Sequence, residues 1–141
     1  MIASKKLSKM KLTKSKFFLL VLSLAGFFDS VYLTILHYKH IIPPCTIALG
    51  CETVLTSRFS TILGIPIALV GALFFLVLIF LLLLGFFKYF KLLILSGVGV
   101  SIVLFCIQAF VLHAFCQYCL LSEVIILTIF ALSLRLHSEK K

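Results

Sequence analysis

Four apolar segments, each long enough to cross a lipid bilayer, constrain the fold of this chain more than any other feature. They cover roughly residues 17–38, 63–87, 91–113 and 116–136. A bilayer core of about 30 Å needs about 20 helical residues, because each residue adds about 1.5 Å along the helix axis. With 63% hydrophobic and only 12% charged residues in the chain, a soluble core could not bury the apolar side chains. The sequence therefore predicts an all-α integral membrane protein, a bundle of four transmembrane helices forming a single domain over residues 1–141.

The basic residues predict the orientation of these helices. Of the 13 lysines and arginines, only Lys39 and Arg58 lie between the first and second segments, and the others precede the first segment, separate the second from the third or follow the fourth. This is the positive-inside pattern, so both termini should be cytoplasmic and the long loop, about residues 39–62, should lie outside. The net charge of +9 is thus a topology signal, with possible contact to anionic lipid, and no nucleic-acid partner is expected.

The long outer loop has a helical pattern of its own. Val54, Leu55, Arg58, Phe59 and Ile62 recur at helical spacing. A short amphipathic helix lying on the membrane surface would satisfy this pattern.

Four of the five cysteines fall on the outer side in this topology. Cys45 and Cys51 form a C-x5-C pair in the loop, and Cys116 and Cys119 form a C-x-x-C pair at the start of the fourth segment. Compartments outside the cytoplasm favour disulfides. Two cysteine pairs facing such a compartment, one in a loop and one on a helix, indicate a relay for electrons. Cys106, within the third segment, is expected to be a small buried apolar residue.

The position of the C-x-x-C pair indicates its chemistry. A thiol at a helix N-terminus meets the positive end of the helix dipole and free N–H groups, which favour the thiolate. Cys116 should lie there, at the lipid–water boundary, and Cys119 should lie one turn deeper, about 4.5 Å along the axis. A lipid-soluble oxidant such as a quinone could therefore meet Cys119.

The same four cysteines allow two other interpretations. They would also suit a four-thiolate zinc site or a pair of structural disulfides. The alternative function is therefore a membrane metal-binding or carrier protein with four outer thiolates, which would contain stoichiometric zinc and reduce no quinone. A third function is a structural membrane subunit with inert disulfides, which would show no thiol turnover.

Several polar residues lie within the predicted spans. Asp29 is in the first segment, with Tyr32 on the same helical face. Asp29 is expected either to handle protons or orient the lid, or to be a helix-packing acid bonded to hydroxyls or a helix N-terminus. Glu123 shares about the same face of the fourth segment as both C-x-x-C cysteines. It could supply protons to a quinone or extend to the outer water. Gln108 and His113 are weaker candidates for the same pocket.

Several short motifs follow one another along the chain in a fixed order. They are G-F-F-D-S-V-Y-L-T (26–34), the loop cysteines, T-S-R-F (56–59), L-G-I-P (63–66) and C-Q-Y-C-L-L-S (116–122). In this order, and with four spans among them, the chain resembles the vitamin K epoxide reductase family and its prokaryotic homologues from Phe17 to Leu136.

The resemblance implies a four-helix bundle around a quinone pocket, with the outer loop as a partial lid. It also implies roles for the cysteines. Cys45 would exchange with the thiols of a partner, Cys51 would pass the electrons to Cys116, and Cys119 would reduce the quinone. No metal is expected.

The chain also departs from the animal members of this family. It has five rather than seven residues between the loop cysteines, Ser60 aligns with a quinone-contacting asparagine, and Glu123 replaces a tyrosine. These departures favour an ordinary respiratory quinone over vitamin K epoxide. Ser57 matches a position near the lid and the active disulfide. The residues expected to bind the quinone or support the site are Ser57, Ser60, Asp29, Tyr32, Glu123 and Ser122.

The expected function is therefore that of a thiol:quinone oxidoreductase in a prokaryotic cytoplasmic membrane, with both cysteine pairs facing the periplasm or exterior. It would reoxidise a disulfide-forming protein of the thioredoxin fold. Many prokaryotic relatives carry a fused thioredoxin domain, whereas this sequence ends at Lys141, so the partner is expected to be a separate soluble protein.

Overall fold

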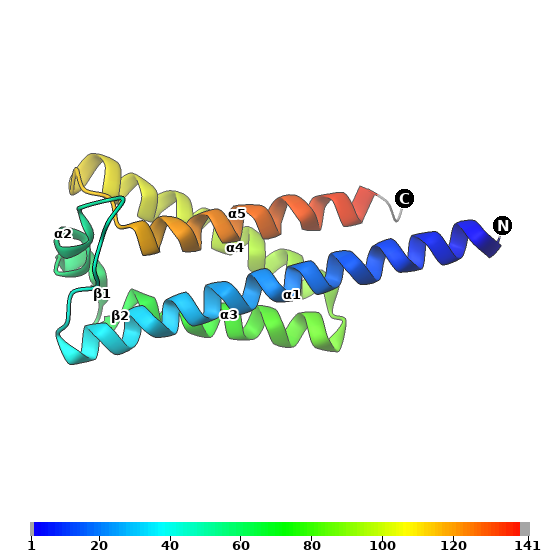
Figure 1. Ribbon diagram of the computed structural model, residues 1–141, viewed down its shortest axis with the longest axis horizontal. Coiled ribbons are helices and arrows are strands. Elements are labelled where there is room, and N and C mark those ends of the chain that lie inside the picture. The colour runs from blue at the N-terminus through cyan, green and yellow to red at the C-terminus, as the bar shows by residue number, and fades with distance from the viewer. Residues whose placement is uncertain (1, 139–141) are drawn as a thin grey trace.

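Long apolar helices make up most of the computed structural model, which describes residues 2–138. Within these residues, four helices are long and apolar enough to cross a membrane. Figure 1 shows them side by side, with the start of the first and the end of the last at the same end of the bundle. The predicted four-transmembrane-helix fold is confirmed. The helices are α1 (Ile2–Lys39), α3 (Ile67–Leu84), α4 (Phe87–Cys106) and α5 (Gln117–Ser138).

The helix ends differ from the predicted ones where local backbone geometry intervenes. Helix α3 begins at Ile67 rather than near residue 63, because the preceding residues form a small antiparallel hairpin of β1 (Thr61–Ile62) and β2 (Ile65–Pro66). Its two turn residues, Leu63 and Gly64, both have positive φ, at 54° and 83°, as a tight hairpin turn requires. Helix α3 ends at Leu84 and is followed by Gly85, whose φ of 78° is the left-handed conformation that commonly closes a helix.

Close contacts between helices hold the bundle together. Helix α1 packs against α3 and α5, and α4 packs against α5 and α3. A Cβ atom on Gly26 of α1 would collide with the ring of Phe75 on α3, and one on Gly97 of α4 would collide with the ring of Phe74. Small residues at such interfaces let helices approach closely in lipid. Large apolar side chains elsewhere, such as Phe28 and Phe110, are exposed on surfaces that a bilayer would cover.

The segment between α1 and α3 folds over one end of the bundle, opposite the end where α1 begins (Figure 1). We call this the cysteine end. The segment contains the short helix α2 (Cys51–Leu55) and a 3-10 turn (Arg58–Ser60). A short helix in this loop was predicted and is confirmed, but its predicted extent through Ile62 was wrong. Helix α2 ends before Ser57, whose backbone is extended (φ −69°, ψ 159°). Thr56 Oγ1 donates to the carbonyl of Glu52, and Ser57 Oγ donates to that of Val54.

Candidate redox site

The loop cysteines form a disulfide-bonded pair at the cysteine end. Cys45 and Cys51 are joined by a disulfide, with their Cα atoms 6.3 Å apart. Cys51, at the start of α2, is only 1% exposed, whereas Cys45 is half-buried. Of the two sulfurs, that of Cys45 is therefore the more accessible to another protein.

The loop next to Cys51 lies directly against the residues that lead into α5. Leu49 pairs with Cys116 in an isolated antiparallel bridge. A Cβ atom on Gly50 would come within 2.7 Å of the amide nitrogen of Phe115 and 2.8 Å of the Ala114 Cβ. Such close backbone approach is possible only with glycine. The backbone on the N-terminal side of Cys51 thus lies against the backbone at Cys116.

The C-x-x-C pair lies at the N-terminus of α5, and both cysteines are free thiols. Cys116 is fully buried, and its carbonyl accepts the hydrogen bond from Leu120 N at 2.9 Å that begins the helix. A hydrogen bond with the Cys119 thiol lowers the pKa of the Cys116 thiol most. The backbone N–H groups of Cys119 and Tyr118 lower it further, against the opposing effect of burial. Cys116 is therefore the thiol whose anion this helix end stabilises.

A buried polar chain connects Cys116 to Glu123. The backbone N–H of Cys116 donates to Gln108 Oε1 at 3.0 Å, and Gln108 Nε2 donates to Glu123 Oε1 at 3.1 Å. Gln108 is 3% exposed and Glu123 is 8% exposed, so the carboxyl group points into the bundle rather than to water. Gln108 belongs to a π-helical turn, Ile107–Val111, that continues α4. Such turns change the direction of side chains and are frequent at functional sites.

Asp29 and Tyr32 occupy different surroundings despite their shared helical face. Ser122 Oγ donates to Asp29 Oδ2 at 2.7 Å, which ties α5 to α1. The ring of Tyr32 lies beside that of Tyr118, with 5.6 Å between centroids, and is 41% exposed. Neither Asp29 nor Tyr32 lines the cavity described next. The arrangement of Asp29 is that of a helix-packing acid bonded to a hydroxyl.

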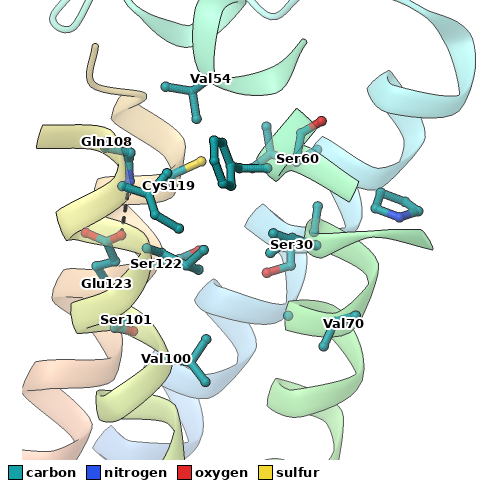
Figure 2. Close-up of a pocket in the computed structure, with 18 of the residues that line it drawn as sticks. Ser30, Val54, Ser60, Val70, Val100, Ser101, Gln108, Cys119, Ser122 and Glu123 are labelled. Carbon is teal, nitrogen blue, oxygen red and sulfur yellow. Dashed lines mark hydrogen bonds between the residues drawn. The ribbon is translucent and has the colours of Figure 1, made fainter. Parts of the chain in front are cut away.

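A cavity of ≈ 230 Å³ lies between the helices, beneath the loop. Figure 2 shows the sulfur of Cys119 pointing into it from the wall that also carries Ser122 and Glu123, with Ser30 and Ser60 on the opposite side. Gln108 lines the cavity too, whereas Cys116 does not. Most of the other lining side chains are apolar, including Val54, Leu55, Phe59, Phe74, Phe75, Val100 and Leu104.

The two loop serines also line the cavity. Ser57 Oγ donates to the carbonyl of Val54, and Ser60 Oγ donates to that of Ser57 at 2.8 Å. Both hydroxyl hydrogens therefore donate within the loop, and only the oxygen lone pairs remain to accept a hydrogen bond from a molecule in the cavity.

Two other predicted placements were wrong. Cys106 was expected to be buried, but it is exposed on α4, because the surrounding lipid is as apolar as a protein core. His113 does not line the cavity. It is exposed in the turn after α4, where its φ is 49°.

Two contributing residues were not singled out in the sequence, although they are the middle residues of the C-x-x-C motif. Gln117 Oε1 accepts hydrogen bonds from the backbone N–H groups of Thr46 and Ile47. Gln117 Nε2 and the hydroxyl of Tyr118 both donate to the carbonyl of Pro44. The polarity of Gln117 in an otherwise apolar stretch was the available signal.

The four-thiolate zinc site of the alternative function is not formed within residues 2–138. Over this range, no three His, Cys, Asp or Glu side chains come together in a way that could hold a metal ion. Two of the four thiols are instead joined to each other.

Comparison with known proteins agrees with this arrangement of helices and cysteines. A family model described as the vitamin K epoxide reductase family matches residues 17–134. A search of curated proteins found no match to the chain.

Proposed function

The chain belongs to the vitamin K epoxide reductase family, and from this premise we propose that it is a thiol:quinone oxidoreductase. Membership implies an oxidoreductase, and its four apolar helices make it an integral membrane protein. The proposed substrates are a reduced soluble protein of the thioredoxin fold and a respiratory quinone of the membrane. The reaction forms a disulfide in the protein substrate and reduces the quinone to a quinol.

The proposed electron path uses both cysteine pairs in turn. A thiolate of the protein substrate attacks Cys45 and breaks the Cys45–Cys51 bond, and its second thiolate then releases Cys45, so the partner leaves with a disulfide. The Cys51 thiolate attacks Cys116, which frees Cys119, and Cys45 then closes on Cys51 and frees Cys116. The helix dithiol passes two electrons and two protons to the quinone as its own disulfide re-forms.

One observation carries this proposal: the loop pair and the helix pair meet through the backbone pairing of Leu49 with Cys116. Exchange between two pairs requires that a thiolate approach a sulfur of the other pair directly. The contact of Gly50 with Ala114 and Phe115 brings Cys51, the next residue, to the start of α5. In the structure the loop cysteines are joined by a disulfide and the two helix cysteines are free thiols.

The cavity beside Cys119 supports the proposed quinone site. Its ≈ 230 Å³ is somewhat below the roughly 300–1,000 Å³ of pockets that enclose drug-sized ligands, which suits a ring headgroup whose apolar tail remains in lipid. Glu123 on the same wall is the proposed proton donor, with Gln108 fixing its direction. Ser57, Ser60 and Ser122 are proposed to support the headgroup, and Asp29 and Tyr32 to support the wall indirectly.

The proposed orientation places the cysteine end outside and both termini in the cytoplasm. It is supported by the basic residues at the opposite end of the bundle, where Lys88 and Lys91 share a second cavity with His137 of α5. Lys16 lies over the ring of Phe87 at the same end, 4.7 Å from its centroid. This is the distribution that the positive-inside rule associates with the cytoplasmic face. Lys140 and Lys141, which also carried the sequence prediction, lie outside the described residues.

A coupled assay tests the function. Purified protein is mixed with a reduced thioredoxin-fold partner and a soluble quinone, and quinone loss is followed by absorbance. We expect one quinone reduced for each partner disulfide formed. Stoichiometric zinc in the purified protein together with no quinone reduction would instead support the metal-binding alternative.

Replacing Gly50 with alanine should slow partner-driven turnover by at least about tenfold, because a misplacement of about 1 Å at a reacting centre can cost far more than that. The new Cβ would contact Ala114 and Phe115 and push Cys51 away from Cys116. The matched control is Gly99→Ala on α4, where a Cβ meets nothing within 4 Å. Equal turnover in the two variants would show that the close approach at Gly50 is not needed.

Replacing Glu123 with glutamine should slow quinone reduction about 100-fold, the lower range for loss of a general acid. The amide can still accept the hydrogen bond from Gln108 but cannot deliver a proton. Rapid mixing of the reduced variant with quinone measures this step directly. Glu52→Gln, at an exposed carboxyl group in α2, is the control and should reduce quinone at the wild-type rate. A wild-type rate in Glu123→Gln would assign the proton to another donor.

A further inference from the structure

The middle residues of the C-x-x-C motif hold the loop backbone on both sides of Cys45. Gln117 Oε1 accepts from Thr46 N at 3.2 Å and from Ile47 N at 3.1 Å. Gln117 Nε2 donates to the Pro44 carbonyl at 3.5 Å, and Tyr118 Oη donates to the same oxygen at 3.2 Å. These contacts join parts of the chain that are 70 to 74 residues apart.

A glutamine is suited to this arrangement because its amide both accepts and donates. The carbonyl oxygen has two lone pairs and the NH2 group has two hydrogens. Here the oxygen meets two successive backbone N–H groups after Cys45, while the nitrogen meets the carbonyl before it. One side chain on the rigid first turn of α5 therefore holds the whole stretch from Pro44 to Ile47.

These bonds involve backbone atoms and do not depend on the sulfur atoms of the loop. While the Cys45–Cys51 disulfide is intact, it links this stretch to α2 by itself. When a substrate opens that bond, the covalent link between Cys45 and Cys51 is lost. The segment of the loop that the disulfide had closed then gains conformational freedom. Opening the disulfide removes none of the atoms that the hydrogen bonds of Gln117 use.

We propose that Gln117 is a positioning residue for exchange between the two cysteine pairs, holding the loop so that Cys51 stays beside Cys116 after the loop disulfide opens. This inference rests on the electron path proposed above. In the step concerned, the Cys51 thiolate forms a bond to Cys116 as the Cys116–Cys119 bond breaks and Cys119 leaves as the thiolate. Cys45 then attacks Cys51, and Cys116 leaves as the thiolate. Gln117 itself exchanges no proton and no electron.

The experiment measures how readily Cys51 reaches Cys116, without a partner or a quinone. In a Cys45→Ser, Cys106→Ser, Cys119→Ser background, only Cys51 and Cys116 remain. The purified full-length protein is equilibrated with glutathione buffers of graded redox ratio, and the fraction of Cys51–Cys116 disulfide is read by alkylation and intact mass. This fraction gives the effective concentration of one thiol at the other, which rises when the two are held in place.

Two substitutions at the same position separate positioning from general stability. Gln117→Met has similar length but makes none of the three hydrogen bonds, and should lower the effective concentration about tenfold or more, as the loss of several bonds of ordinary strength implies. Gln117→Glu keeps both acceptor contacts with Thr46 and Ile47 and should stay within about threefold of the parent. Tyr118→Phe, which removes one bond to Pro44, should have a smaller effect than Gln117→Met.

The outcomes are distinct. The proposal is supported if the effective concentration falls tenfold in Gln117→Met and stays near the parent value in Gln117→Glu. Equal thermal unfolding temperatures of the two variants would show that the difference does not come from stability. An effective concentration in Gln117→Met equal to that of the parent overturns it, as does an equal loss in Met and Glu. Turnover of the wild-type protein is assayed separately, so a chain that reduces no quinone contradicts the proposed function while the result for Gln117 still stands.

Discussion

Quinone reduction should fall to background when Cys119 is changed to serine, while exchange between the partner and Cys45–Cys51 should remain measurable. The reason is the placement of the sulfurs: that of Cys119 points into the cavity, and Cys116 is fully buried outside the cavity lining. Without the Cys119 thiol there is no helix disulfide to accept electrons from Cys51 and no helix dithiol to reduce the quinone. Single-turnover mixing separates the two steps, with partner oxidation read by gel shift and quinone loss by absorbance.

The control for this prediction is Cys106→Ser, because Cys106 is an exposed free thiol on α4 that does not line the cavity. It should reduce quinone at the wild-type rate. If Cys119→Ser also did so while Cys116→Ser did not, the two sulfurs of the motif would have the opposite roles.

Replacing Cys51 with serine should reduce partner-driven turnover to background and leave Cys45 in a mixed disulfide with the partner. Cys45 is the more exposed loop sulfur, and with Cys51 gone no loop thiol remains to resolve its bond to the partner. The partner used for trapping lacks its second cysteine, which would otherwise release Cys45. Incubation in an oxidising glutathione buffer, followed by alkylation and a non-reducing gel, shows the adduct as a band that reduction removes. Cys45→Ser should give no such band, and normal turnover of Cys51→Ser would rule out the proposed order of the relay.

The sequence predicts the membrane bundle well because each helix is indicated by one continuous stretch of the chain. An apolar run of sufficient length has few structural options in lipid, so four segments give four helices. The ends of the helices were less predictable. The hairpin turn at Leu63 and Gly64 shortens α3, and the extended backbone of Ser57 ends α2 early. Both helix ends depend on the backbone conformation of single residues, which the spacing of apolar residues in the sequence does not reveal.

The sequence predicted the residues of the site whose chemistry follows from their type. It did not predict contacts that depend on the direction in which a side chain points. The two cysteine pairs could be recognised from their C-x5-C and C-x-x-C spacings in the sequence. The hydrogen bond that Glu123 accepts comes from Gln108 in the π-helical turn, and no periodicity in the sequence indicates that turn. The contacts of Gln117 with the loop reach across 70 or more residues and exist only once the bundle has formed.

The central claim is that both cysteine pairs lie on one path to the quinone, and counting electrons tests it most directly. The wild-type protein is fully reduced, freed of reductant and mixed anaerobically with excess soluble quinone, and quinol is measured per chain at completion. Because each dithiol carries two electrons, the account predicts two quinones reduced per wild-type chain and one per Cys45→Ser, Cys51→Ser chain. A value of one for the wild-type protein, unchanged by removal of the loop cysteines, would contradict it.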